Sequence, residues 1–533
     1  MGGTPTLAEL GASSVLVRLP CDDRPIHRTP AAPGALSQGT WVLAAAILGS
    51  AMPGIDGTAV NVALPVLQRE LHASAAAFQW NVEGYALFLS ALILVGGSLG
   101  DHLGRRRMFV VGVSIFAAAS LACGLAQTSA QLIAVRCIQG IGGALLVPES
   151  LALITASFDE RRRGAAIGTW SGFLAATMAV GPLLGGWFVQ SLSWRLIFFI
   201  NVPVAIAVVL IALRHVPESR DAGLPARLDW TGAALATAAL GALTYGLIGL
   251  QPPPSSSAYL ALAIGLALAA IFLLVERRSA NAMVPLAIFK SKDFAVANLY
   301  TLLLYAGLGG ALFYIPFNLI NVQHYTPFGA GAALLPMIAL MFASSRWAGG
   351  LVARVGARIP LTVGAFIAGC GFVAFALTGV GGSYWTTFFP AVVLFGIGTS
   401  TFVAPLTTTV MNSAPSEHAG TASGVNNAIS RVAGVLAIAI LGIVIVASAQ
   451  NAVRRADHTL PTTVRRALEG QSLLSGRMSE RGIAPPLRPT VRRLARDSFL
   501  SGFRHAMFVA AALAWISAFL AFTQLRSIKL SRS

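Results

Sequence analysis

Long runs of apolar residues alternate with short polar breaks along almost the whole chain. About fourteen runs can be counted, each near the roughly 20 residues that a helix needs to cross a bilayer. They begin near Trp41, Phe78, Met108, Gln131, Gly164, Arg195, Asp229, Ala258, Phe294, Ala330, Pro360, Tyr384, Gly424 and Gly502. Helices satisfy all their backbone polar groups internally, as lipid requires. The pattern therefore predicts an all-α, polytopic membrane protein.

Composition supports this interpretation. The 533 residues are 56% hydrophobic and 11% charged, whereas soluble domains average about 25% charged residues. The four cysteines (Cys21, Cys123, Cys137 and Cys370) show no metal-ligand spacing. We therefore expect no metal, no cofactor and no disulfide framework, and the composition excludes a soluble nucleic-acid-binding protein.

The formal net charge of +17 is distributed unevenly between the breaks. Arginines gather in alternate breaks, at 105–107, 161–163, 277–278, 354 and 358. The intervening breaks, at 127–131, 190–193, 251–257 and 379–383, contain no Lys or Arg. Cytoplasmic loops retain basic residues, so the asymmetry predicts a cell-membrane protein with both termini in the cytoplasm.

One stretch breaks the charge rule. Residues 450–497 are polar and rich in arginine, yet the count of spans places them outside. Either this is a long translocated loop, which obeys the rule only weakly, or the count is wrong by one span. Its piece 491–496 is a candidate interfacial amphipathic helix.

An internal repeat divides the chain. Four residues recur at one constant offset: Gly97, Leu99, Gly104 and Arg106 as Gly349, Leu351, Gly356 and Arg358. Two bundles related by duplication are typical of transporters. We expect a disordered cytoplasmic tail at 1–40, a six-helix bundle at 41–215, two linker spans at 216–293, a second six-helix bundle at 294–525 containing the loop 450–497, and a cytoplasmic tail at 526–533.

Several motifs resemble those of one family. The string at 97–107, with Gly97, Asp101, Gly104, Arg105 and Arg106, resembles the loop signature of the major facilitator superfamily. The strings at 55–65, 132–144, 181–186 and 194–203 follow in the order of its fourteen-segment drug:proton antiporters, the EmrB/QacA type. The resemblance implies two rocking six-helix bundles plus two extra central helices. It also implies proton-coupled export of small amphipathic organic compounds, that is, multidrug efflux conferring antibiotic resistance.

Ionisable groups inside the apolar runs are candidates for proton coupling, because charge at membrane depth is costly. The acidic ones, Asp56, Glu83 and Glu149, all lie in the first half. A rise of about 1.5 Å per residue places Asp56, Glu83 and Arg136 at one level. Our hypothesis is that Asp56 binds the coupling proton and Arg136 tunes it.

Alternatives remain for each group. Asp56 could bond backbone groups near Gly54 and Gly57, and Arg136 could brace neighbouring carbonyl groups. Glu83 could lie where water reaches it. Glu149 could satisfy a carbonyl freed by the kink at Pro148, or face a wet cavity.

A glycine-rich string, Gly181, Pro182, Gly185 and Gly186, resembles the antiporter motif of the fifth helix. Small residues at this spacing allow close helix contact, which either seals one side against ion leak or is ordinary packing. Five residues are candidates for lining a substrate cavity: Asn61, Tyr85, Trp170, Tyr305 and Tyr314.

Other functions are less well supported. A dedicated exporter or importer of one metabolite on the same fold is the nearest alternative. A membrane-embedded enzyme would need a paired acidic motif or a His cluster in its loops, and neither occurs. The sequence contains no GxxxxGK[ST] string for direct ATP drive. If the cell has two membranes, the resemblance also implies a periplasmic adaptor and an outer-membrane channel as partners.

Overall fold

The computed structural model describes residues 35–71, 73–158, 160–220, 229–250, 254–279, 282, 284, 286–349, 351–413, 419–455 and 485–525. Nearly all of this part of the chain is helical, as the apolar pattern predicts. Among the described residues, thirteen helical segments are long and apolar enough to cross a membrane. The helix α5 (Glu160–Ser191) has 32 residues and corresponds to the remaining predicted span.

The first half contains α1 (Ala35–Glu70), α2 (Ala75–Leu103), α3 (Arg105–Leu125), α4 (Ser129–Ser157), α5, and the pair α6 (Leu196–Phe199) and α7 (Asn201–His215). The linker helices are α8 (Trp230–Gly249) and α9 (Ser256–Arg278). The second half contains the 3-10 turn η1 (Leu286–Lys290), α10 (Lys292–Phe317), the π-turn η2 (Asn318–Val322), α11 (Pro327–Ala332), α12 (Leu335–Gly349), α13 (Leu351–Val355), α14 (Arg358–Ala376), α15 (Tyr384–Thr387), α16 (Phe389–Asn412), α17 (Ala419–Arg455), η6 (Pro485–Leu487) and α19 (Arg488–Gln524).

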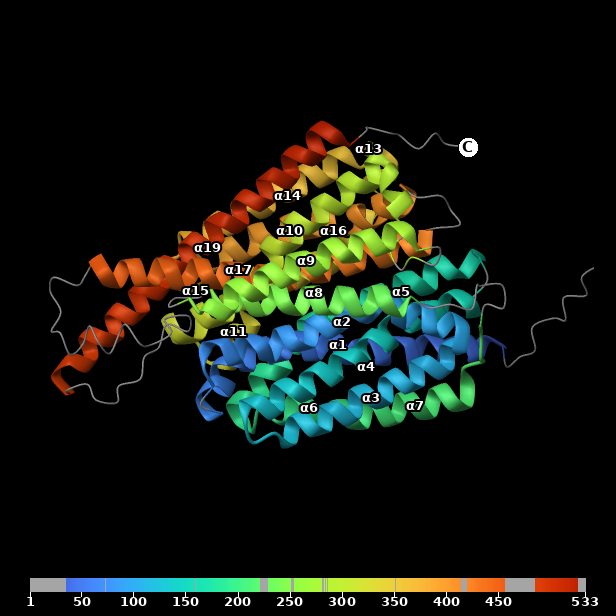
Figure 1. The fold of residues 1–533 in the computed structure, drawn as a ribbon, viewed down its shortest axis with the longest axis horizontal. Coiled ribbons are helices and arrows are strands. Elements are labelled where there is room, and N and C mark those ends of the chain that lie inside the picture. The colour runs from blue at the N-terminus through green and yellow to red at the C-terminus, as the bar shows by residue number, and fades with distance from the viewer. Residues whose placement is uncertain are drawn as a thin grey trace, which may run out of the picture.

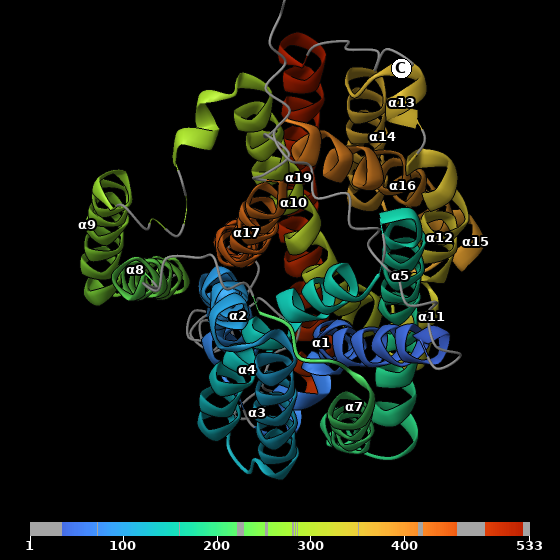
Figure 2. The ribbon, with the colours of Figure 1, turned by 90° about the vertical axis from the view of Figure 1, so that its right-hand side faces the viewer.

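These helices form two bundles that lie side by side. Figure 1 shows the first half below the second half, and Figure 2 shows the same division end-on. The linker helices α8 and α9 pack against each other, and α8 contacts both α2 and α17. The linker pair therefore sits on the outside of the seam between the bundles, as Figure 2 shows at the left.

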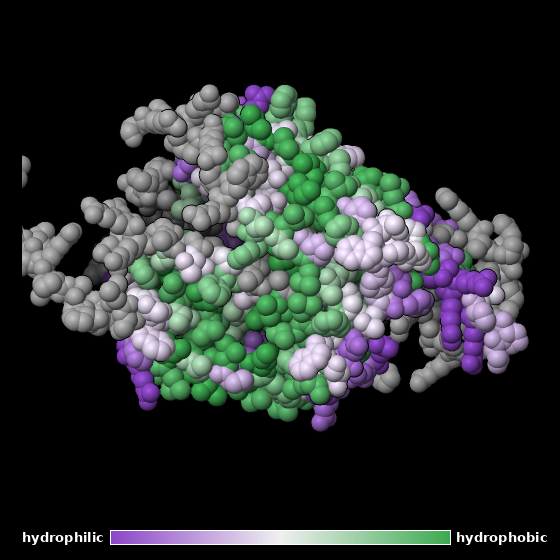
Figure 3. All heavy atoms as spheres, turned by 180° about the vertical axis from the view of Figure 1, so that it is seen from behind, coloured by the Kyte–Doolittle hydropathy of each residue, from purple (hydrophilic) through white to green (hydrophobic). Residues whose placement is uncertain are grey.

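The surface has the polarity that a bilayer requires. Figure 3 shows a largely hydrophobic middle with hydrophilic residues toward the two ends of the molecule. Large apolar side chains of the linker helix α9 are more than half exposed, among them Tyr259, Leu260 and Leu266. An apolar surface of this extent is stable in lipid but not in water.

The repeated motif forms the same turn twice. Gly104 separates α2 from α3 with φ +109°, and Gly356 separates α13 from α14 with φ +77°. L-residues with a side chain rarely adopt such positive φ values. A Cβ at Gly104 would also approach the Glu218 carboxylate to 2.8 Å. The turn therefore requires glycine in the first copy for two separate reasons.

Two ends of the molecule can be named from their contacts. The end with the Gly104 turn, called the Gly104 end, also holds the beginning of α1, because Trp41 stacks on His215 near the end of α7. The opposite end holds the end of α1, because the Trp194 indole donates a hydrogen bond to Glu70 at 2.7 Å. We call it the Trp194 end.

The structure corrects the expected limits of two polar segments. The loop expected at 450–497 is shorter, because 450–455 belong to α17 and 488–497 to α19. The piece 491–496 is not a separate interfacial helix. It is the first part of α19, in which Val491 and Ala495 are buried and Arg492 and Arg493 are exposed. The expected tail at 1–40 also overlaps α1 from residue 35, and its remainder, like 526–533, lies outside the described residues.

Candidate functional site

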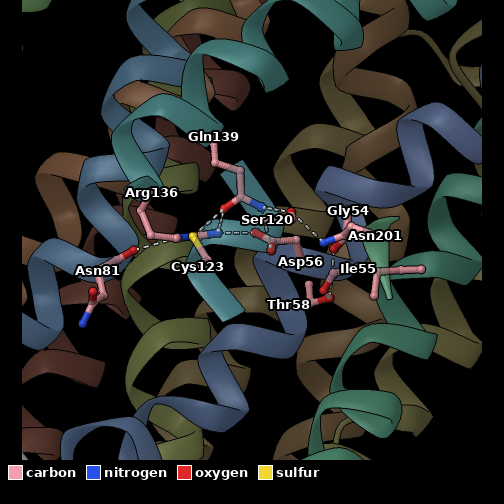
Figure 4. A network of polar contacts seen from close by, with 10 residues as sticks. All are labelled: Gly54, Ile55, Asp56, Thr58, Asn81, Ser120, Cys123, Arg136, Gln139 and Asn201. Atoms are coloured by element: carbon pink, nitrogen blue, oxygen red, sulfur yellow. Dashed lines mark hydrogen bonds and ion pairs between the residues drawn. The ribbon is translucent and has the colours of Figure 1, made fainter. Parts of the chain in front are cut away.

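A buried ion pair joins α1 to α4 in the first bundle. The Arg136 Nη1 atom donates to the Asp56 carboxylate, and the two side chains are 1% and 0% exposed. The Arg136 Nε atom donates to the backbone carbonyl of Asn81 on α2 at 3.0 Å. Figure 4 shows the guanidinium between these acceptors. The pair brings two charges into a site that water does not reach in this conformation.

Gln139 completes the pair. Its Oε1 accepts from Arg136 Nη1 at 2.6 Å, and its Nε2 donates to Asp56 at 3.1 Å and to Ser120 Oγ on α3 at 2.7 Å. Asn201 on α7 donates to the same hydroxyl at 3.1 Å. The network thus connects five helices of the first bundle, and nearly all of it consists of side-chain contacts (Figure 4).

Aromatic rings enclose the guanidinium. The Tyr85 ring centroid lies 4.2 Å from Arg136 Cζ, and the Phe198 centroid lies at 5.8 Å. Aromatic faces attract cations, and they also exclude water from the pair. The arrangement holds Asp56 in a low-dielectric environment in which its charge depends on Arg136 and Gln139.

This geometry decides between the alternatives for two residues. The carboxylate of Asp56 is bonded to side chains and not to backbone groups near Gly54 and Gly57, so that alternative is wrong. The hydroxyl of Thr58, not Asp56, bonds the carbonyl groups of Gly54 and Ile55. Arg136 braces the Asn81 carbonyl group, as one alternative expected, and it also contacts the Asp56 carboxylate, so its role in proton coupling stays a prediction.

The other two membrane acids do not join the pair. Glu83 is 0% exposed, so the alternative in which water reaches it is wrong in this conformation. Neither of its carboxylate oxygens has a hydrogen-bond partner among the described residues. It lies within electrostatic range of Tyr314 on α10. Sequence spacing placed Glu83 level with Asp56 but could not indicate that it faces the second bundle.

Glu149 lies beside the Gly104 turn. It is 0% exposed, and neither oxygen has a partner in the part of the chain that the structure describes. Both expected settings are therefore wrong in this conformation: the side chain bonds no carbonyl group and faces no wet cavity. A Cβ at Gly100 would overlap its carboxylate, so the glycine provides the space that Glu149 fills.

The loop motif is held by charges that include a residue the sequence analysis missed. Arg105 donates to one oxygen of Asp101 through Nε at 2.9 Å and Nη2 at 2.7 Å. Glu218, beyond α7, accepts from the backbone N–H groups of Arg106 and Arg107 at 3.0 and 3.2 Å. A carboxylate at this position satisfies free N–H groups at the start of α3.

The glycine-rich string on α5 packs against both bundles. A Cβ at Gly185 would lie 2.8 Å from the backbone of Ala59 on α1, and one at Gly181 would overlap Thr58 on the same helix. A Cβ at Gly186 would lie 2.6 Å from the Pro327 carbonyl oxygen at the start of α11, in the second bundle. The glycines allow the predicted close packing, and Gly186 contacts the start of α11 at the Trp194 end; that this contact seals one side against ion leak stays a prediction.

The cavity candidates take different positions. Asn61 lines a cavity of about 60 Å³ between the bundles, together with Pro182, Leu312 and Met337. Tyr314 bridges the bundles, accepting from Gln79 at 3.1 Å and donating to the Ile438 carbonyl at 2.8 Å.

The remaining three candidates do not line this cavity. Tyr85 covers Arg136. Trp170 donates to Ser50 at 3.2 Å within the first bundle, and Tyr305 packs against the hydrophobic core. Small-molecule pockets usually measure about 300–1,000 Å³. The cavity in this conformation is therefore too small for a whole drug-sized molecule.

Comparison with known proteins identifies the family. Residues 46–438 match the Major Facilitator Superfamily description. The chain is 32% identical to the tetracenomycin C resistance and export protein of Streptomyces glaucescens, over 92% of this chain and 93% of that protein. It is 33% identical to the multidrug resistance protein Stp of Mycobacterium tuberculosis (87% and 88%) and to the methylenomycin A resistance protein of Bacillus subtilis (78% and 89%).

Solved structures agree on the fold. A bacterial homologue of the human lysosomal transporter Spinster superposes with a TM-score of 0.62 at 17% identity, covering 92% of this chain and 99% of that one. An auto-inhibited POT family peptide transporter superposes with a TM-score of 0.60 at 15% identity, covering 93% and 99%. The motifs, the two bundles and the relatives agree, and the chain belongs to the major facilitator superfamily.

Proposed function

We propose that this protein exports small amphipathic organic compounds across the cell membrane by alternating access, in exchange for protons. The buried Asp56–Arg136–Gln139 network is the observation that carries the proton-coupling part. A carboxylate whose charge is balanced by a single guanidinium changes its protein contacts when it takes up a proton. Substrate export is supported by the relatives, which are named for resistance to tetracenomycin C, methylenomycin A and several drugs.

The coupling can be followed through the network. When Asp56 binds a proton, it loses its attraction for Arg136, and the Gln139 amide is left to bridge the two groups. Because Gln139 also bonds Ser120, a change at Asp56 shifts α3 and α4 relative to α1. Proton binding and helix position are thus linked through groups of one bundle, and the substrate lies between bundles.

Orientation follows from charge. The Gly104 end carries Arg105, Arg106 and Arg107 at the start of α3, and this basic cluster supports a cytoplasmic location for this end and for both termini. The Trp194 end, where Gly186 meets α11, then faces outward and is closed.

Two steps test the proposal. Cells with and without the protein are challenged with tetracenomycin C, methylenomycin A and puromycin, and protection against at least one compound is expected. Everted membrane vesicles then report uptake of that compound with and without a pH gradient. Wild-type uptake should stop when the gradient is dissipated, and Asp56→Asn should abolish gradient-driven uptake.

The matched control is Asp497→Asn, which removes an acid that is 59% exposed and paired with Arg496 on α19. It should transport like the wild type. Gradient-driven uptake by Asp56→Asn at the wild-type rate would refute the coupling assignment. If the protein protects cells but uptake into everted vesicles does not depend on the pH gradient, antiport is refuted and export is not.

A further inference from the structure

A second arginine with an enclosed Nε atom lies in the second bundle: Arg431 is partly buried, and the sequence pattern assigned it no role. Arg431 lies on α17, seven residues after Gly424, which begins the membrane-spanning part of that helix. A rise of about 1.5 Å per residue puts it roughly 10 Å along the span. Arg431 therefore lies at membrane depth, where a charged side chain is energetically costly and is usually functional.

Arg431 differs from the other embedded arginines in having no partner. Its Nε atom is enclosed by protein, yet it donates to no acceptor among the described residues. By contrast, Arg136 donates from Nε to a carbonyl group, and Arg195 donates to the carbonyl oxygens of Gly124 and Ala126, each at 2.7 Å. Arg136 and Arg195 thus donate to backbone carbonyl groups, whereas Arg431 donates to none within the described ranges.

The residue facing Arg431 also lacks a partner. Tyr85, on α2 of the first bundle, lies within electrostatic range of Arg431. Its hydroxyl is enclosed and has no hydrogen-bond partner within the described ranges. The helices α2 and α17 pack against each other across the seam, as Leu94 does near Gly424. Two donor groups without a hydrogen-bond partner among the described residues therefore lie within electrostatic range of each other across the seam.

Charge balance indicates what would use them. From 294 to 455 the sequence contains one acid, Glu417, which lies outside the described residues. Asp56 is already paired with Arg136. Neither Glu83 nor Glu149 forms an ion pair with Arg431 in the described structure. In the part of the chain that the structure describes, the Arg431 guanidinium therefore has no acidic partner.

We propose that Arg431 and Tyr85 bind an acidic group of the exported molecule, so that the substrates are amphipathic anions rather than cations. A guanidinium offers paired N–H donors that match the two oxygens of a carboxylate or sulfonate, and a phenol adds a third donor. The inference rests on the proposed export function and names its substrate class.

The test uses two permanently charged probes with the same ring system, anthracene-2-sulfonate and (9-anthrylmethyl)trimethylammonium. Neither charge titrates, so a pH gradient cannot alter the probe itself. Binding to purified protein is measured without any gradient, and uptake is measured in everted vesicles. The wild type should bind and take up the sulfonate.

The variants are Arg431→Gln, Arg431→Lys and Tyr85→Phe, with Arg496→Gln as a control that removes an arginine at the surface end of α19. Arg431→Gln should weaken sulfonate binding at least tenfold, because it removes a charge-assisted contact. Arg431→Lys should retain part of the affinity, and Arg496→Gln all of it. The cation should bind no more weakly to Arg431→Gln than to the wild type. Unchanged thermal stability of Arg431→Gln shows that the loss is not misfolding.

Three results would overturn the inference. They are no binding of the sulfonate by the wild type, binding of the sulfonate by Arg431→Gln within twofold of the wild type, and an equal loss of both probes by Arg431→Gln. If Glu83→Gln also loses both probes equally, Arg431 pairs with Glu83 in another conformation instead of binding the substrate. Because binding is measured without a gradient, these results are independent of proton coupling, which is tested separately by the gradient dependence of uptake by the wild type and by Asp56→Asn.

Discussion

The buried pair of Asp56 and Arg136 makes a quantitative prediction about stability. Arg136→Gln removes the donors to Asp56, Asn81 and Gln139 and leaves a carboxylate without its cation. Removing one partner of a buried ion pair typically costs about 3–5 kcal/mol. Asp56→Asn should cost less, because Arg136 keeps the Asn81 carbonyl and Gln139 Oε1, and Gln139 Nε2 can still donate to the new side-chain oxygen.

The double variant Asp56→Asn/Arg136→Gln distinguishes pairing from simple packing. It contains no unpaired charge, so it should be more stable than Arg136→Gln alone. The coupling energy between residues in one network is at most about 3 kcal/mol. Equilibrium unfolding of the purified variants in mixed micelles measures this cycle. A double variant whose loss equals the sum of the single losses would refute the view that the two charges stabilise each other.

Two further variants test the turn and the seam. Glu218→Ala should lower the free energy of unfolding by about 1 kcal/mol, because the N–H groups of Arg106 and Arg107 lose their acceptor. The free energy of unfolding of Glu218→Gln, which keeps one side-chain oxygen, should lie between those of the wild type and Glu218→Ala. A free energy of unfolding of Glu218→Ala equal to that of the wild type would contradict the capping role. Gly186→Leu should open the Trp194 end, because its side chain would overlap the start of α11; a cysteine introduced at Asn61 should then react faster with a membrane-impermeant thiol reagent from outside, whereas an unchanged rate would show that the glycine does not close the seam.

Much of the fold could be predicted from the sequence, because membrane spans depend on length and polarity alone. The repeat also located both glycine turns, since Gly104 and Gly356 have positive φ. The segment 491–496 is amphipathic, with Val491 and Ala495 buried and Arg492 and Arg493 exposed, but it continues into the last span as part of α19 and is not a separate helix. Local composition cannot show which face of a helix another helix covers.

The site was only partly predictable. Helical rise placed Asp56 and Arg136 at one depth, but rotation about each helix decides contact, and it turned Glu83 toward the other bundle. Gln139 stood in a recognised motif, yet its bridging role depends on χ angles that spacing does not give. Arg431 carried a detectable signal, a lone cation in an apolar run, which a search centred on acids passed over. Glu218 lay outside the spans and gave no such signal.

The central claim is that Asp56 carries the proton that drives export, and one measurement tests it most directly. Purified protein is reconstituted into liposomes that contain a pH indicator, and a transported compound is added without an imposed gradient. The wild type should move protons opposite to the compound, in a fixed ratio. Asp56→Asn should bind the compound yet move no protons. Substrate-driven proton movement by Asp56→Asn at the wild-type ratio would contradict the account.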